Sequence, residues 1–271
     1  LENQHFIRWE TQRGCLFKCG FCQHKEPGAR LPKHRFLSER ILKEIDLFCK
    51  KGVEDIAVLD PIFNSTKEAI EILSRFIENG FTGRLSLQCR AELITKEFID
   101  VASKLDVRLE FGLQTIHKNE ELAINRRNNI KKISKVLDWV KKAKINYEIS
   151  IIYGLPNQTL ESFKETINWC LSKSVPVLKA FPLMLLRGTE IEKNKQQWGL
   201  IESDDIMPVV LQSNTFTFQD WVQMSKMSEA LKESEDNHPK FIEDLIIKSK
   251  KLTINHGRFQ PQKSQIKRIK V

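Results

Sequence analysis

The chain has 271 residues, of which 41% are hydrophobic and 29% charged, a balance that excludes a disordered or fibrous protein. No apolar stretch approaches the ~20 residues of a membrane-spanning helix and no signal peptide is visible, so we expect a cytoplasmic protein without a membrane partner. The net charge of +9 permits a nucleic acid or another anion as partner, and a lysine-rich surface accounts for it equally well. Because the sequence lacks an initiator methionine, we expect it to come from a longer chain.

Strand-like and helix-like segments alternate along the sequence. We expect strands at residues 6–11, 55–59, 84–89, 107–113, 147–153 and 175–186. The helices between them are expected at residues 38–51, 65–80, 95–104 and 159–173, with a further helical pattern up to residue 144. Ser65 and Glu68 form a capping-box pattern at the start of the second helix, and Thr159 is the expected cap of the helix that it begins.

The predicted strands favour a parallel sheet. Residues 149–152 are mostly apolar, as is typical of parallel strands that are buried on both faces. Strands and helices in alternation indicate an α/β fold with right-handed crossovers. A complete eight-unit barrel takes ~250 residues, whereas the six units of this chain end near Thr189. We therefore expect a partial (βα)6 TIM-like barrel over residues 1–200 and a mostly helical C-terminal extension over residues 201–271.

Three cysteines, Cys15, Cys19 and Cys22, stand at C-x3-C-x2-C spacing in the loop after the first predicted strand. Such folds place their chemistry at the carboxyl ends of the strands. Thiolates are soft ligands that select an iron–sulfur cluster, zinc or copper(I), and three of them on a four-iron cluster leave one iron open. The alternatives are a structural zinc site completed by His24 or His34, and three cysteines without a metal.

This segment resembles the radical S-adenosylmethionine (SAM) superfamily, because the cysteine loop, with Phe21 before its last cysteine, follows the first strand of a βα barrel. Residues 10–14 resemble the stretch that enters the loop in the cobalamin-associated and methylthiotransferase-like branches, and the likeness extends over about residues 5 to 200. The resemblance implies a [4Fe-4S] cluster on Cys15, Cys19 and Cys22, whose open iron binds SAM beside Phe21. Reductive cleavage of SAM would give a 5′-deoxyadenosyl radical that abstracts hydrogen from a substrate.

The resemblance also implies SAM contacts at the ends of the second and third strands. Asp60 could accept a hydrogen bond from the SAM amino group, although an ordinary Asp-Pro turn explains it as well. Arg90 ends the third strand, where a guanidinium suits the SAM carboxylate. The alternative for Arg90 is a surface residue that caps the end of the barrel.

The other candidates for SAM contacts lie on or after the fourth and fifth strands: Glu110, Gly112, Gln114, Arg126, Gly154 and Leu155. In the family the small residue of the fourth strand clears room, and the polar ones face the ribose or the methionine part. Arg126 resembles an arginine-bearing turn and is a second candidate for the SAM carboxylate. The fifth strand lies against adenine in the family, and Gly154 would let the backbone approach it closely.

The expected partners are SAM, an electron donor such as a flavodoxin or ferredoxin, and a substrate that is a small molecule, a peptide or an RNA. Methyl transfer, methylthio transfer and rearrangement all remain open, and cobalamin is expected only if a missing N-terminal domain supplies it. Cys49, Cys89 and Cys170 are scattered, which favours core packing over a second cluster. The rival hypothesis is a noncatalytic, zinc-stabilised module that binds RNA or protein through its basic surface.

Overall fold

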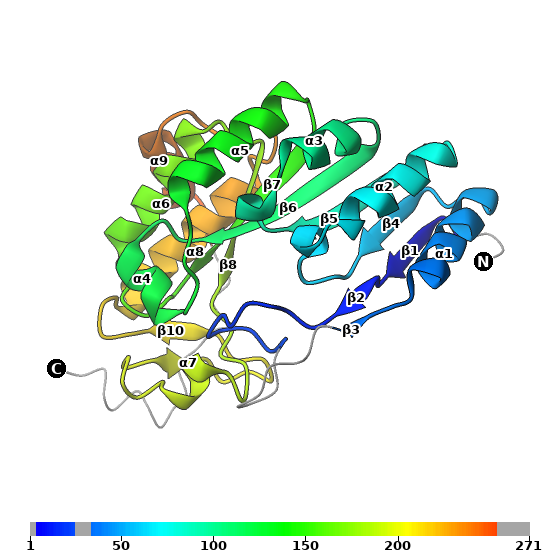
Figure 1. Cartoon of the computed structure of the whole chain (residues 1–271). Helices are drawn as coiled ribbons and strands as arrows, with labels where there is room; N and C mark the ends of the chain where they lie inside the picture. The colour runs from blue at the N-terminus through cyan, green and yellow to red at the C-terminus, as the bar shows by residue number, and fades with distance from the viewer. Residues whose placement is uncertain (1–3, 25–33, 254–271) are drawn as a thin grey trace. The chain divides into compact units, whose positions relative to one another are not determined.

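The computed structural model describes residues 4–24 and 34–253, and its central feature is a six-stranded sheet (Figure 1). The strand order is β1-β4-β5-β6-β7-β8. The six strands are β1 (Phe6–Trp9), β4 (Asp55–Val58), β5 (Arg84–Cys89), β6 (Asp106–Gln114), β7 (Asn146–Tyr153) and β8 (Val177–Pro182). All six predicted strands form, and the order follows the chain. The α/β fold with a partial TIM-like barrel is therefore confirmed.

The parallel register places one row of apolar side chains across the sheet. Trp9 pairs with Val58, Val58 with Leu87, and Leu87 with Leu109. All four side chains are buried. Along β6 the residues alternate between buried and half-exposed, so one face of this strand carries the core and the other carries polar side chains.

The chain divides into two compact units. Unit 1 consists of Leu1–Leu16, Arg30–Gly112 and Asn129–Glu148, and unit 2 of Phe17–Ala29, Leu113–Asn128 and Ile149–Val271. The division falls inside β6 and inside β7.

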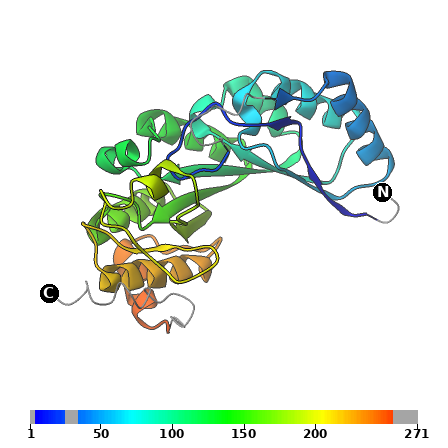
Figure 2. The same ribbon diagram turned by 90° about the horizontal axis from the view of Figure 1, so that it is seen from below.

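In unit 1 the helices cover one side of the strands, as the blue and cyan segments show (Figure 2). The helices are α1 (Ser38–Lys50), α2 (Glu68–Glu78), α3 (Lys96–Ala102) and α5 (Ile130–Lys142). Unit 1 also contains two 3-10 turns, η1 (Phe63–Ser65) and η2 (Ala91–Leu93), and a short antiparallel pair of strands, β2 (Gln12–Arg13) and β3 (His34–Arg35). Trp9 packs edge-on between Phe48 of α1 and Phe76 of α2, with ring centroids 5.5 and 6.0 Å away. These contacts bury the apolar faces of both helices.

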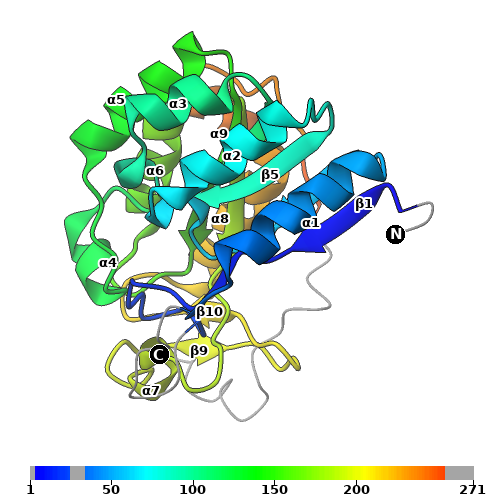
Figure 3. The ribbon, with the colours of Figure 1, turned by 45° about the vertical axis from the view of Figure 1, so that its right-hand side comes forward.

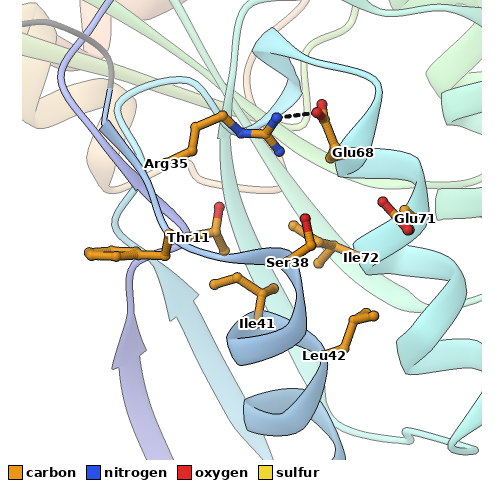
Figure 4. Close-up of a pocket in the computed structure, with 9 residues that line it drawn as sticks. Thr11, Arg35, Ser38, Ile41, Leu42, Glu68, Glu71 and Ile72 are labelled. Carbon is orange, nitrogen blue, oxygen red and sulfur yellow. Dashed lines mark hydrogen bonds and ion pairs between the residues drawn. The ribbon is translucent and has the colours of Figure 1, made fainter.

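The capping box predicted at Ser65 is wrong. Helix α2 begins only at Glu68, and Lys67 precedes it without a side-chain cap. Ser65 belongs to η1 and receives a hydrogen bond from Gln12 Nε2 (3.3 Å). Glu68 instead pairs with Arg35 beside a cavity of about 20 Å³ between α1 and α2, too small for a ligand (Figure 4). A tertiary ion pair has replaced the expected local cap.

Unit 2 contains the remaining elements: α4 (Lys118–Ala123), α6 (Leu160–Ser172), α7 (Glu190–Lys193), α8 (Phe218–Lys232), α9 (Ile242–Lys250), β9 (Ile201–Glu202) and β10 (Val210–Gln212). The C-terminal part is helical as expected, but it also holds an antiparallel pair, β9 and β10, which the sequence patterns did not predict (Figure 3). Trp221 of α8 is fully buried and packs against Tyr153 at the end of β7. No helix among the described residues is long and apolar enough to cross a membrane.

Candidate active site

The cysteine loop spans residues 15–24, and hydrogen bonds within unit 2 hold its backbone at Lys18 and Gly20. Gly20 N–H donates to the carbonyl of Ile124 at 2.7 Å, and Ile191 N–H donates to the carbonyl of Gly20 at 3.2 Å. Asn125 Nδ2 donates to the carbonyl of Lys18 at 2.9 Å. A Cβ at Gly20 would lie 3.4 Å from the Ile124 oxygen, which is an ordinary van der Waals distance. The loop is thus fixed by the turn after α4 and by the start of α7.

Arg126, in the same turn, contacts a cysteine. Its Nη1 lies 3.6 Å from Cys19 Sγ, and Cys19 is only 8% exposed. Asn125, just before it, has a φ of +49°, which lets the turn reverse directly after α4. The sequence patterns predicted this turn and its arginine but not the sulfur contact. A role for Arg126 in binding the SAM carboxylate stays a prediction.

Three of the predicted site residues line one open cavity in unit 2. Phe21, Cys22 and Gln114 border a cavity of about 570 Å³. The rest of its lining consists of Gln23, His24 and Ser150 and of apolar residues of β7, β8 and the segment after β8. Sites for small molecules typically measure about 300–1,000 Å³. Gln114 has a φ of +70°, and its buried Oε1 has no hydrogen-bond partner among the described residues. An unpaired buried acceptor is costly. Oε1 is itself closed to solvent, so the cavity is bordered by another part of Gln114.

The turn after β7 holds Gly154 and Leu155. The backbone N–H groups of both residues donate to Gln158 Oε1, at 2.7 and 3.2 Å. Gly154 has a φ of +89°, and a Cβ there would lie 3.2 Å from the carbonyl oxygen of Val210. The structure therefore gives Gly154 a packing role against the β10 backbone. Its predicted contact with adenine, and that of the fully buried Leu155, stay predictions.

A buried carboxylate supports that turn and was missed by the sequence analysis. Glu120 of α4 has no exposed surface, and it accepts hydrogen bonds from Thr115 Oγ1 (2.6 Å), Ser162 Oγ (2.5 Å) and Gln158 Nε2 (3.3 Å). Gln158 Nε2 also donates to the carbonyl of Ile152 at 3.1 Å. Glu120 and Gln158 thus tie the end of β6, helix α4 and the start of α6 to the turn after β7.

In unit 1, Asp60 anchors the approach to the cysteine loop. Its carboxylate is fully buried and accepts hydrogen bonds from the backbone N–H groups of Thr11 (2.8 Å) and Gln12 (3.2 Å), and from the Thr11 hydroxyl. Burial raises the pKa of Asp60, although these hydrogen bonds act in the opposite direction. The carboxylate oxygens already accept hydrogen bonds from Thr11 and Gln12, which follow β1. A contact of Asp60 with the SAM amino group stays a prediction.

Arg90 is buried and braced at the end of β5. Asn64 exchanges two hydrogen bonds with the Arg90 backbone, at 2.9 and 3.0 Å, and the guanidinium forms an ion pair with Glu92 at 3.3 Å. Glu110 and Gly112 lie on the half-exposed face of β6. Burial raises the pKa of the Cys89 thiol, and the negative charge of Glu110 adds to this effect. Cys89 is therefore a packed core thiol, as predicted, while SAM contacts by Arg90, Glu110 and Gly112 stay predictions.

Among residues 4–24 and 34–253, no three His, Cys, Asp or Glu side chains are gathered closely enough to hold one metal ion. In a four-iron cluster, however, each cysteine binds its own iron, so the sulfur atoms need not converge on one point. The donor set of three thiols in the cysteine loop, with Cys22 and Gln114 at one cavity, fits such a cluster with SAM beside it.

A parallel partial barrel with a three-cysteine loop after its first strand is typical of proteins that depend on an iron–sulfur cluster. The family profile described as the radical SAM superfamily matches residues 9–170, and the chain belongs to this superfamily. Its members are enzymes that use a [4Fe-4S] cluster and SAM. The resemblance stated from the sequence is therefore confirmed.

The chain is similar to several known proteins over part of their length. It is 26% identical over 209 residues to the cobalamin-dependent radical SAM methyltransferase TokK of Streptomyces tokunonensis, covering 72% of this chain and 30% of TokK. It is 24% identical over 200 residues to the uncharacterized protein MJ0486 of Methanocaldococcus jannaschii, covering 66% of this chain and 61% of that protein. The methyltransferase TsrM from Kitasatospora setae shares the fold with a TM-score of 0.64 and 16% identity, over 76% of this chain and 41% of TsrM. The chain thus spans less than two thirds of each of these relatives.

Proposed function

We propose that this chain is the core of a radical SAM enzyme in which Cys15, Cys19 and Cys22 hold a [4Fe-4S] cluster that cleaves SAM reductively. The observation that carries the proposal is the position of Cys22, which lines the same cavity as Gln114. A thiol of the cysteine loop and a polar side chain at the end of β6 therefore border one space of ligand size.

The chain's own residues would bind, orient and shield the reactants. When bound, the cluster supplies the electron that breaks a carbon–sulfur bond of SAM. Gln114 would contact SAM from the end of β6, and Phe21 would cover the cofactor from the cysteine loop. Apolar side chains such as Ile152 and Leu183 line the cavity and would keep water from the reacting carbon. We propose further SAM contacts at seven residues: Asp60, Arg90, Glu110, Gly112, Arg126, Gly154 and Leu155.

Within this class, we infer transfer of a methyl group, with cobalamin as a second cofactor where an N-terminal domain supplies it. The names of TokK and TsrM, a cobalamin-dependent methyltransferase and a methyltransferase solved with cobalamin, support this choice. The electron would come from a low-potential carrier such as a flavodoxin or ferredoxin in the cytoplasm. In this proposal residues 1–200 form the catalytic barrel and residues 201–271 its extension.

The test compares Cys19→Ala with Cys49→Ala in anaerobically reconstituted protein. Cys49 lies on α1, outside the cysteine loop, and serves as the matched control. The parent protein and C49A should bind about four irons with sulfide, absorb broadly near ~400 nm and form 5′-deoxyadenosine from SAM and a strong reductant. C19A should form no more 5′-deoxyadenosine than a sample without enzyme.

Two outcomes would contradict the proposal. One equivalent of zinc without visible absorbance would support the noncatalytic zinc module. Equal amounts of 5′-deoxyadenosine from C19A and the parent would show that the loop does not hold the cluster.

A further inference from the structure

Arg126 is the cationic side chain that the structure places against a proposed cluster ligand. Its Nη1 lies 3.6 Å from Cys19 Sγ, within the range of hydrogen bonds to sulfur, and Cys19 is 8% exposed. We propose that Arg126 donates a hydrogen bond to the Cys19 sulfur and thereby raises the reduction potential of the cluster. This inference rests on the proposed function, because it requires a cluster on Cys19.

The position of Arg126 is fixed by the backbone around it. Arg126 N–H donates to the carbonyl of Glu121 at 2.8 Å, which closes the turn after α4. The two residues before Arg126 grip the cysteine loop on either side of Cys19, through the bonds from Gly20 to Ile124 (2.7 Å) and from Asn125 to Lys18 (2.9 Å). The segments that carry the sulfur and the guanidinium are therefore joined by two hydrogen bonds, one between backbone groups and one from the Asn125 side chain. A long side chain that met the sulfur by chance would lack this support.

The direction of the effect follows from charge. Reduction adds one electron to the cluster, so it increases the negative charge on the cysteine sulfurs. A cationic N–H donor stabilises the reduced form more than the oxidised form, and hydrogen bonds to the sulfurs and solvent exposure are known determinants of cluster potential. Because Cys19 is buried, water screens the interaction between its sulfur and the Arg126 guanidinium little. Arg126 thus makes the cluster easier to reduce, independently of any contact with the SAM carboxylate.

The test measures the midpoint potential of the reconstituted cluster without SAM, by a redox titration followed by electron paramagnetic resonance. Arg126→Gln removes the charge and the guanidinium, and Arg127→Gln removes the same charge from the next residue, whose side chain is exposed. At a fixed potential, R126Q should show at least a tenfold lower ratio of reduced to oxidised cluster, which corresponds to about 59 mV for one electron. R127Q should match the parent.

The inference is overturned if R126Q has the potential of the parent, or if R126Q and R127Q shift equally, since the effect would then be one of overall charge. If R126Q takes up too little iron to titrate, Arg126→Leu replaces it. Leucine also removes the charge and the N–H donors, so we expect a shift in the same direction, and an unshifted potential overturns the inference. Failure of the parent itself to bind a cluster would instead contradict the proposed function.

Discussion

Two carboxylates are fully buried without forming an ion pair among the described residues. Asp60 is surrounded by N–H and hydroxyl donors of Thr11 and Gln12, and Glu120 by those of Thr115, Gln158 and Ser162. Each therefore acts as a hydrogen-bond acceptor that holds several segments in place. Such a group stabilises a unique arrangement of loops, but it pays for the loss of its own hydration.

Asp60 should make the stability of the folded chain depend on pH, and Asp60→Asn should remove that dependence. Burial raises the pKa of Asp60 in the folded chain, so the folded state favours the protonated form. The stabilisation from that form is complete below the ordinary aspartate pKa of about 3.9, and it is lost as the pH rises through the raised folded value. Asparagine has the same shape, stays neutral and keeps an acceptor for the two backbone N–H groups.

We therefore expect the free energy of unfolding of D60N, relative to the parent, to increase as the pH rises from 4 towards 7. Urea unfolding at a series of pH values measures this difference. A difference that is constant with pH, or that decreases, would show that hydrogen bonding outweighs burial at Asp60.

At the scale of elements, the turn after β7 depends on one side chain. Gln158 accepts hydrogen bonds from the N–H groups of Gly154 and Leu155, and its Nε2 donates to the carbonyl of Ile152 and to the carboxylate of Glu120. Its own backbone carbonyl accepts from Thr215 Oγ1 at 2.6 Å. The strand end that we propose to face adenine is thus shaped by Gln158 and by the helices that Glu120 connects.

Gln158→Ala should lower the free energy of unfolding by about 2–4 kcal/mol, because it leaves several buried polar groups without partners, each at a cost of about 1–3 kcal/mol. Gln223→Ala, at an exposed position of α8, is the matched control and should change stability by less than about 0.5 kcal/mol. Urea unfolding of both variants provides the comparison. Equal stability of Q158A and Q223A would mean that the turn keeps its shape without the amide.

The sequence could predict the elements whose causes are local. The alternation of strand-like and helix-like segments placed all six strands, and Thr159 caps α6 as expected, in a capping box with Ser162. The capping box at Ser65 failed because Gln12 and Arg35, far away in the sequence, engage Ser65 and Glu68 instead. Local patterns record which side chains can cap a helix, but tertiary partners decide which of them do.

The same distinction holds at the candidate site. The cysteine spacing and the polar residues at strand ends are visible in the sequence, because chain position alone places them at the carboxyl edge of the sheet. The hydrogen bond between Gln158 and Glu120 is not visible in the sequence, because the two residues lie 38 positions apart. The contact between Arg126 and the Cys19 sulfur is not visible either, because these residues lie 107 positions apart. A buried glutamate within a helical pattern looks like a surface residue until its donors are known.

At the scale of the whole molecule, a cluster bound as proposed should stabilise the folded chain, because a ligand that binds the folded state more tightly than the unfolded state shifts the folding equilibrium. A ligand present at a hundred times its dissociation constant adds about 2.7 kcal/mol. In a chain of this size that corresponds to a rise in Tm on the order of 5–10 °C. Anaerobic calorimetry of the reconstituted protein, before and after removal of the cluster by oxidation and chelation, measures the change.

The control for this last prediction is Cys19→Ala, which keeps the rest of the loop contacts made by Lys18 and Gly20. Its Tm should be that of the cluster-free parent, and the same oxidation and chelation should leave it unchanged. An equal loss of Tm in C19A and the parent would show that the treatment damages the chain itself. A parent whose Tm is the same with and without iron would mean that the cluster binds folded and unfolded chains alike, contrary to a site built by the fold.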